Sequence, residues 1–274
     1  MFHHRAWSPR NTLLFRDSSE ALALWRILVR TFPNALSMCL MPDHVHLLLP
    51  EDGSRVRLSQ AESAYARWRN AHRQERGAVF ARQPDVQPVP EDRERRVVRY
   101  IHLNPVRKGL VDDPLGWPFS THRDLLRLAV PAIGEAEREP ARFHRMVSGY
   151  EDAPSGTPFP TIQLEDFAWE DVRDAVTSVC RVPIDALTQR TEARRLALKT
   201  AWMHGVCDLE RLRQETGAHR SHVYRLVVDL PPRTVPVADE GLDACLRAVG
   251  DPRFRGLGGL AQSPGWRRWY GFRR

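Results

Sequence analysis

The feature that most constrains this chain is the stretch MPDHVHLLLP at residues 41–50, an apolar run bounded by two prolines and interrupted by two histidines. Its composition and limits predict a short buried strand. Because strand side chains alternate between faces, we expect His44 and His46 on one face and Val45 on the other. Two imidazoles held by a rigid strand suit a divalent metal ion, although an isolated His-x-His is more often a polar pair on a solvated face.

A second stretch, RYIHLNPVRKGLV at residues 99–111, is predicted to form a helix that opens near Pro90. Pro105 disfavours helical geometry at the residue before it, so we expect the helix to end at Asn104. Tyr100 and Asn104 are four residues apart and share a helix face. The tyrosine is a candidate nucleophile and the amide oxygen a candidate metal ligand. Taken alone, the pair is more typical of a half-buried tyrosine followed by a helix stop.

Together, these two stretches resemble the single-tyrosine His-hydrophobic-His transposases, and among them the REP-associated tyrosine transposases related to small bacterial insertion-sequence transposases. Weaker likeness extends from Leu14 to His122. The resemblance implies that His44 and His46 bind Mg²⁺ or Mn²⁺. It implies that Asn104 supplies the third ligand and that Tyr100 is the nucleophile.

The activity implied by the resemblance is cleavage and rejoining of single-stranded DNA. Tyr100 would attack a phosphodiester, form a 5′-phosphotyrosine and release a 3′-hydroxyl, on DNA whose repeats form hairpins. Two alternatives stay open. One is a domesticated, sequence-specific DNA-binding protein with little or no catalysis. The other is a metal-dependent hydrolase that activates water and in which Tyr100 is structural.

The predicted order strand, helix, strand, strand, helix, strand is that of the ferredoxin-like split βαβ fold. We therefore expect an α+β protein whose antiparallel sheet has helices on one face, followed by an all-α helix-turn-helix domain. Residues 1–17 contain a proline and little strand pattern, so the first strand of the family is not expected intact. The resemblance also implies a homodimer, since a partner subunit can supply the tyrosine helix in relatives.

Composition shifts divide the chain into four predicted segments. The predicted boundaries are a catalytic domain at 1–130, a linker at 131–165, a helix-turn-helix domain at 166–232 and a basic, aromatic tail at 233–274.

Basic residues exceed acidic ones by 41 to 34, giving a net charge of +7 and a pI near 9.7. This surplus fits a polyanionic partner, although arginine-rich composition also follows from a GC-rich genome. A basic, aromatic helix predicted at 54–73 suits single-stranded DNA, and a helix with buried rings and solvated arginines is an equally good interpretation. The predicted DNA-binding residues of the first domain are Arg67, Arg69, Arg73, Arg107 and Lys108.

The segment 208–230 contains a glycine between two amphipathic runs, which indicates a helix-turn-helix. A small helical bundle that binds nothing is the alternative. The DNA-facing residues predicted for its second helix are Arg220, Ser221, His222, Tyr224 and Arg225.

The four cysteines are widely scattered, without a CxxC pair, so neither a zinc site nor a disulfide framework is expected. The N-terminal residues lack the apolar core of a signal peptide, and no run is long enough to span a membrane. These features predict a cytoplasmic protein, which the resemblance would place on the bacterial nucleoid, with no membrane partner.

Overall fold

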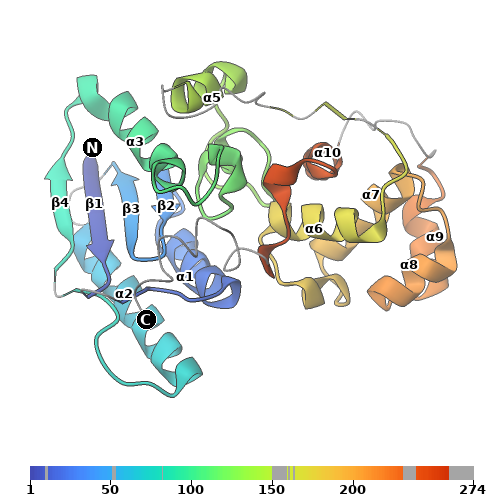
Figure 1. Ribbon diagram of the computed structural model, residues 1–274, viewed down its shortest axis with the longest axis horizontal. Coiled ribbons are helices and arrows are strands. Elements are labelled where there is room, and N and C mark those ends of the chain that lie inside the picture. Colours follow the sequence, from blue (N-terminus) through green and yellow to red (C-terminus); the bar gives the residue numbers. More distant parts are fainter. Residues whose placement is uncertain are drawn as a thin grey trace.

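The computed structural model describes residues 1–9, 12–50, 54–81, 83–149, 159, 161–162, 164–230 and 239–258. These residues form two lobes along the long axis of the molecule (Figure 1). One lobe holds the sheet and helices α1 to α3, and the other holds helices α6 to α10. The fold is α+β, as the sequence predicts.

The first lobe follows the predicted order of strands and helices. Its elements are β1 (Phe2–Trp7), α1 (Ser18–Thr31), β2 (Ser37–Leu40), β3 (His44–Leu49), α2 (Ser54–Arg73), β4 (Asp85–Pro88) and α3 (Glu94–Arg107). The strands pair in the order β2-β3-β1-β4, and every pair is antiparallel. This is the strand order of a ferredoxin-like sheet, with the short β4 at one edge.

The N-terminal strand is intact, which corrects the expectation from the sequence. Residues Phe2–Trp7 occupy a central position between β3 and β4. Their side chains alternate, with His4 and Ala6 buried on the face opposite that of His3 and Arg5. Pro9 lies beyond the strand and does not interrupt it. Pairing with two neighbouring strands therefore overrides the weak local strand pattern.

The two faces of the sheet carry different helices. Helices α1 and α2 pack together over one face, and Tyr65 of α2 donates a hydrogen bond to the carbonyl oxygen of Leu14 at 2.7 Å. Helix α3 contacts β2 and β3 on the other face. The sheet thus has helices on both faces. The sequence predicted a layer of helices on one face, with the helix that carries Tyr100 only near the other face.

Helix α3 continues past Asn104 to Arg107, so the prediction that Pro105 ends it is wrong. A proline at this position removes one hydrogen bond, the one to Ile101, and the following amides still bond normally. The amide of Lys108 donates to the carbonyl oxygen of Asn104 at 3.0 Å. The burial of Ile101 and Leu103 holds this turn in place.

The second lobe is all helical, as predicted. Its elements are α6 (Trp169–Cys180), α7 (Glu192–Met203), α8 (Leu209–Thr216), α9 (Arg220–Val227) and α10 (Glu240–Ala248), with short 3₁₀ turns at Ile184–Leu187 and Pro252–Phe254. Within the described residues, no helix is long and apolar enough to cross a bilayer.

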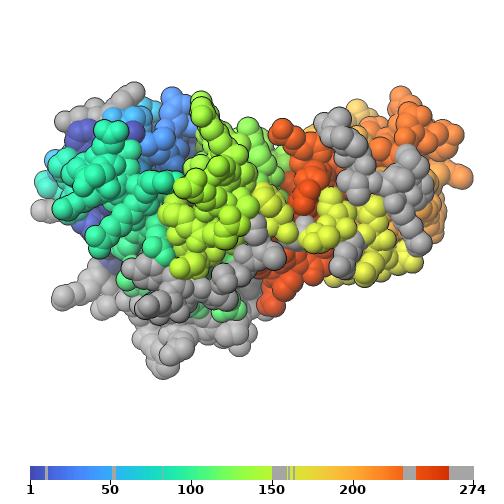
Figure 2. Space-filling model, turned by 90° about the horizontal axis from the view of Figure 1, so that it is seen from above, coloured from blue at the N-terminus to red at the C-terminus, as the bar shows by residue number. Residues whose placement is uncertain are grey.

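Two segments differ from the predicted domain plan. Helix α5 (Pro140–Ser148) lies inside the predicted linker, contacts α3 and buries Phe143 and Val147. Figure 2 shows it between α3 and α10 on one face of the molecule. Helix α10 lies inside the predicted tail and packs on α6 and α7. The basic, aromatic end of that tail, residues 266–274, lies outside the described residues.

Candidate active site

The two histidines of β3 lie on the sheet face that α3 covers. His46 stands opposite Arg5 of β1 and Cys39 of β2, and the rings of His44 and His46 are 4.7 Å apart between centroids. Both residues are buried, at 7% and 1% exposure. The period of the strand brings them together, while Val45 joins the hydrophobic core.

Each histidine has its Nδ1 atom engaged, which determines what its Nε2 atom can do. Nδ1 of His44 donates to Oδ1 of Asp43 at 2.6 Å, and Nδ1 of His46 lies 2.9 Å from Nε2 of His3. A carboxylate can only accept, so His44 carries its proton on Nδ1 and a lone pair on Nε2. The Nε2 atom of a neutral His3 can accept a hydrogen bond from Nδ1 of His46, and in that arrangement His46 has the same tautomer as His44.

Asn104 of α3 meets both Nε2 atoms. Its Nδ2 atom lies 2.7 Å from Nε2 of His46 and 3.3 Å from Nε2 of His44. Rotation of the amide by half a turn exchanges its nitrogen and oxygen and turns the oxygen to the same point. Two imidazole nitrogens and one amide oxygen then converge, and these are acceptable donors for a small divalent cation.

The donor set fits a cation only because the amide takes part. Among the described residues, no group of three or more His, Cys, Asp or Glu side chains is placed to hold a metal ion. A cation bound here would be held by two histidines and Asn104, and its remaining coordination positions would be left to water or phosphate oxygens. Open positions are a feature of catalytic metal sites.

Burial keeps the imidazoles of His46 and His3 neutral. It lowers the pKa of His46 well below the usual value, with further lowering by the neighbouring His44 and His3. Burial and the charge of Arg5 lower the pKa of His3 to about 4. Burial opposes ionisation of Asp43, yet its hydrogen bond to His44 lowers the pKa of that carboxyl. Neutral imidazole is the form that binds metals.

Tyr100 stands one helical turn before Asn104 and beside the histidines. Its ring centroid lies 5.4 Å from that of His46 and 6.2 Å from that of His3. The side chain is 38% exposed, so its hydroxyl can be reached from solvent. The guanidinium of Arg107 lies 5.7 Å from the centre of the ring. All four residues predicted for catalysis and metal binding are thus gathered at one place.

A curated protein and a solved structure are similar to parts of this chain. No family model matches the chain. A curated protein of Haemophilus influenzae, provisionally named a REP-associated tyrosine transposase, is 28% identical over 105 residues, which is 33% of this chain. Over those residues, the chain is similar to that provisionally named transposase. It spans 60% of the relative's length.

A solved structure is also similar to the chain. It is described as a REP-associated tyrosine transposase bound to a REP hairpin, with 19% identity and a TM-score of 0.37. The match covers 56% of this chain and 88% of the other.

Of the predicted DNA-binding residues in the first lobe, two lie at the transposase-like site and three do not. Arg107 lies over Tyr100, and Lys108 follows it at the end of α3. Arg67 is exposed on α2, the helix that packs with α1.

The side chains of Arg69 and Arg73 are withdrawn from solvent, which makes the prediction that they contact DNA wrong. Their exposed fractions are only 9% and 7%. Arg73 forms a two-pronged ion pair with the buried carboxylate of Glu20, and Arg69 lies 4.0 Å from Glu75. The physical reason is Glu20: a carboxylate at 2% exposure requires a cation beside it.

The predicted helix-turn-helix is present as α8, a turn at Gly217, and α9. Gly217 has φ of +62°, the left-handed geometry that glycine tolerates. The side chain of His219 caps α9 and accepts a hydrogen bond from the amide of Ser221. Val223 and Val227 face the core. Arg220, Ser221, Tyr224 and Arg225 are exposed and His222 is half-buried.

Sequence reasoning missed His3, whose ring touches that of a predicted metal ligand. The structure buries His3 at 6% exposure. A usable signal existed. In Phe2–Trp7, the apolar Phe2 and Ala6 alternate with the polar His3 and Arg5, which is a half-buried strand pattern.

Proposed function

We propose that this chain is a single-stranded DNA nuclease and strand transferase that uses Tyr100 as its nucleophile. The tyrosine oxygen attacks a phosphodiester, a bond from oxygen to phosphorus forms, and the bond to the 3′-oxygen breaks. The phenol loses a proton and the leaving 3′-oxygen gains one. The products are a 5′-phosphotyrosine and a free 3′-hydroxyl.

The observation that carries this proposal is the meeting of Asn104 with the Nε2 atoms of His44 and His46, one turn from Tyr100. A phenol has a pKa of about 10 and is a weak nucleophile at neutral pH, so it needs its target prepared. Mg²⁺ or Mn²⁺ held by these three residues would neutralise charge on the phosphate oxygens and orient the phosphate. Arg107 and Lys108 add positive charge beside the same phosphate.

The residues around the ligands have a positioning role in this proposal. Asp43 and His3 fix the tautomers and ring orientations of His44 and His46. Helix α3 carries Tyr100 and Asn104 as one rigid unit, so the nucleophile and the third ligand keep a constant separation. The phosphotyrosine conserves the energy of the broken bond, and a 3′-hydroxyl can attack it to rejoin the strand without a nucleotide cofactor.

The substrate class in this proposal is single-stranded DNA that forms hairpins at repeats, as the resemblance of the two motifs to REP-associated tyrosine transposases implies. The alternative of a domesticated, inactive DNA-binding protein was motivated by an eroded first strand. That argument for an inactive protein no longer applies, because β1 is a central strand and places His3 beside His46.

A covalent-trapping assay with tyrosine variants tests the proposal. The full chain is incubated with labelled hairpin DNA from its own flanking sequence and Mg²⁺ or Mn²⁺, then run on a denaturing gel. We expect a metal-dependent shifted band that Tyr100→Phe abolishes. Tyr65→Phe is the matched control. Within the described residues, the Tyr65 hydroxyl bonds only the carbonyl of Leu14, so the adduct should persist in this variant. Strand cleavage that survives in Tyr100→Phe would identify water as the nucleophile instead.

A further inference from the structure

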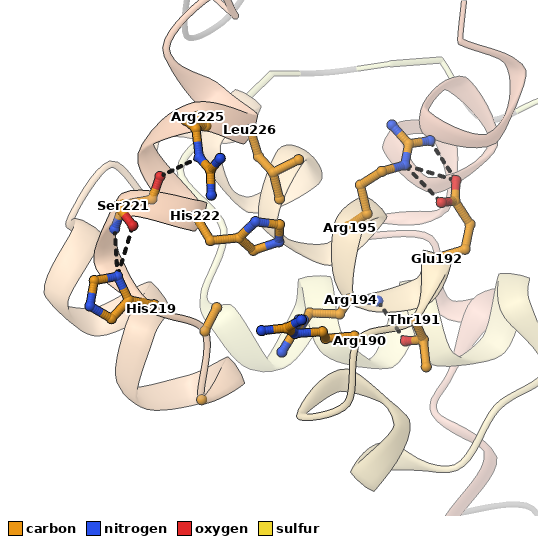
Figure 3. A pocket seen from close by; sticks show the side chains of 12 residues that line it. Arg190, Thr191, Glu192, Arg194, Arg195, His219, Ser221, His222, Arg225 and Leu226 are labelled. Atoms are coloured by element: carbon orange, nitrogen blue, oxygen red, sulfur yellow. Dashed lines mark hydrogen bonds and ion pairs between the residues drawn. The ribbon is translucent and has the colours of Figure 1, made fainter.

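The second lobe contains a pocket of about 670 Å³ that the Tyr100 site does not account for. It lies between the start of α7 and the first half of α9 (Figure 3). Four arginines and two histidines line it, with a single carboxylate. The lining includes Arg190, Arg194, Arg195, Glu192, His222 and Arg225.

The carboxylate in this pocket is already engaged. Glu192 accepts hydrogen bonds from Arg195, with Nε at 2.9 and 2.8 Å from its two oxygens, and Arg195 also reaches Asp239 at 3.1 Å. Figure 3 shows this pair to one side of the pocket, while Arg190 and Arg194 approach His222. Three arginines therefore remain without a counter-charge from the lining.

The contacts of these arginines support that conclusion. Arg194 is only 7% exposed and its Nη1 atom donates to the carbonyl of Thr188 at 3.3 Å. The Nε atom of Arg225 donates to the carbonyl of Ser221 at 3.3 Å. Within the described part of the chain, Arg190, Arg194 and Arg225 form no ion pair with a carboxylate. A largely buried guanidinium bonded only to a carbonyl retains donors for an anion.

The field inside the pocket is positive. Burial lowers the pKa of His222, and the charges of Arg194, Arg225 and Arg190 lower it further. The first turns of α7 and α9 both border the pocket, and the positive ends of their helix dipoles add to the field. Like charges gathered at one place repel one another unless an anion joins them.

The chemistry of the lining selects a phosphate group over a base. Among the described lining residues there is no aromatic side chain apart from the two imidazoles, and the polar atoms are mainly guanidinium and hydroxyl donors. Bases need stacking platforms, whereas phosphodiesters need arginine forks and helix N-termini. The adjoining surface of α9 is also basic, with Arg220 exposed at its first turn and Tyr224 exposed at 54%.

We infer that this pocket binds backbone phosphates of duplex DNA lying along α9, as a second DNA site separate from the Tyr100 centre. In a helix-turn-helix, the second helix enters the major groove with its N-terminal residues, so the flanking phosphates lie beside its first turns. Arg190 and Arg194, at the start of α7, would clamp that strand together with Arg225. The inference rests on the proposed function in taking DNA as the partner.

Duplex binding by charge-matched variants of the full chain tests this inference. The pocket variant is Arg190→Gln/Arg225→Gln, which changes two exposed residues and spares the buried Arg194. The control is Arg173→Gln/Arg247→Gln on α6 and α10, which removes the same charge outside the pocket. Fluorescence anisotropy with labelled duplex DNA is followed over a salt series.

We expect the pocket variant to bind duplex DNA at least tenfold more weakly. The slope of log affinity against log salt should fall by about 1 for each phosphate that the variant no longer binds. The control variant should bind as the wild type does. Equal affinities and slopes for the pocket variant and the control would overturn the inference. So would saturable binding of inorganic phosphate, at constant ionic strength, that the variant loses while its duplex affinity stays unchanged.

The same proteins separate this inference from the proposed function. Covalent trapping on a short hairpin at saturating DNA concentration reports on Tyr100 and should be retained in the pocket variant, because weaker duplex binding does not limit the adduct when the protein is saturated. If the pocket variant forms the adduct and binds duplex DNA as the wild type does, the nuclease proposal is retained and the pocket inference is rejected. If duplex binding depends on the pocket but no adduct forms under any metal condition, the nuclease proposal is rejected and the pocket inference is retained.

Discussion

At the scale of single residues, His3 is the most informative side chain near the candidate metal ligands. It is 43 positions away from His46 in sequence, yet its Nε2 atom lies 2.9 Å from Nδ1 of that histidine. Groups that hydrogen-bond a metal ligand orient its ring and raise its basicity. His3 is thus a positioning residue for the proposed cation.

We predict that His3→Ala weakens Mn²⁺ binding by roughly 10- to 100-fold, the usual effect of losing such a partner. His3→Gln should recover part of the affinity, because its amide oxygen can accept from Nδ1 of His46. His72→Ala, exposed on α2, is the control. Titration calorimetry on folded protein measures the affinity directly. An unchanged affinity in His3→Ala would show that His3 is only a packing residue.

The outcomes at individual residues show what local sequence can predict. His44 with His46, and Tyr100 with Asn104, are neighbours within one element, so the strand and helix periods bring each pair together. The environment of Arg73 depends on Glu20 of another helix, and no local pattern reveals that carboxylate. The position of His3 likewise depends on strand pairing over long range.

At the scale of elements, α3 is held by a buried polar contact behind the site. Nε2 of His102 lies 2.9 Å from Oγ of Ser37 on β2 and 3.0 Å from Oγ1 of Thr121. The ring is fully buried, and burial lowers the pKa of His102 to about 3. The imidazole must therefore stay neutral for α3 to remain docked.

Because the folded pKa of His102 lies below its unfolded value near 6.5, its contribution to stability is complete above about pH 6.5 and is lost as the pH falls towards 3. In metal-free buffer with EDTA, we predict that His102 alone accounts for about 2 kcal/mol of the stability lost between pH 7 and pH 5. His102→Gln should lose correspondingly less over that interval. Urea unfolding at both pH values measures this, and identical losses in variant and wild type would refute it.

The elements themselves were largely predictable. The start of α1 follows from its Asp17 cap and its length from apolar periodicity, and the limits of β3 follow from its bounding prolines. Two features of the elements could not be predicted from the local sequence. β1 is stabilised by two neighbouring strands, and α3 passes through Pro105 because tertiary burial outweighs one missing hydrogen bond.

At the scale of the whole molecule, buried arginines join the two lobes. Arg181, at the end of α6, donates two hydrogen bonds to the carboxylate of Asp124 at 2.9 and 2.6 Å. It also bonds the carbonyl oxygens of Pro118 and Ser120, at 2.5 and 3.0 Å. Phe119 belongs to the hydrophobic cluster of the first lobe and Leu125 to that of the second lobe, so a contact with this segment couples the lobes. Composition shifts along the sequence cannot reveal such long-range contacts. The same limit applies to the predicted linker, which contains the packed helix α5.

We predict that Arg181→Leu lowers the free energy of unfolding by about 3–5 kcal/mol, since it leaves Asp124 buried without its partner. Arg181→Leu/Asp124→Leu should recover part of the loss, because no charge is then stranded. Arg173→Leu, on the outer face of the same helix, should change stability by less than about 1 kcal/mol. Chemical denaturation measures all three. A loss in the double variant as large as that in Arg181→Leu would argue that the ion pair is not the cause.

The central claim is that Tyr100 becomes covalently joined to DNA. The most direct measurement is mass spectrometry of the trapped complex after digestion with protease and nuclease, which identifies the modified residue. The account predicts one modified peptide, the one containing Tyr100, carrying the mass of a 5′-linked nucleotide. Cleaved DNA with no modified peptide, or a nucleotide on another residue, would contradict it.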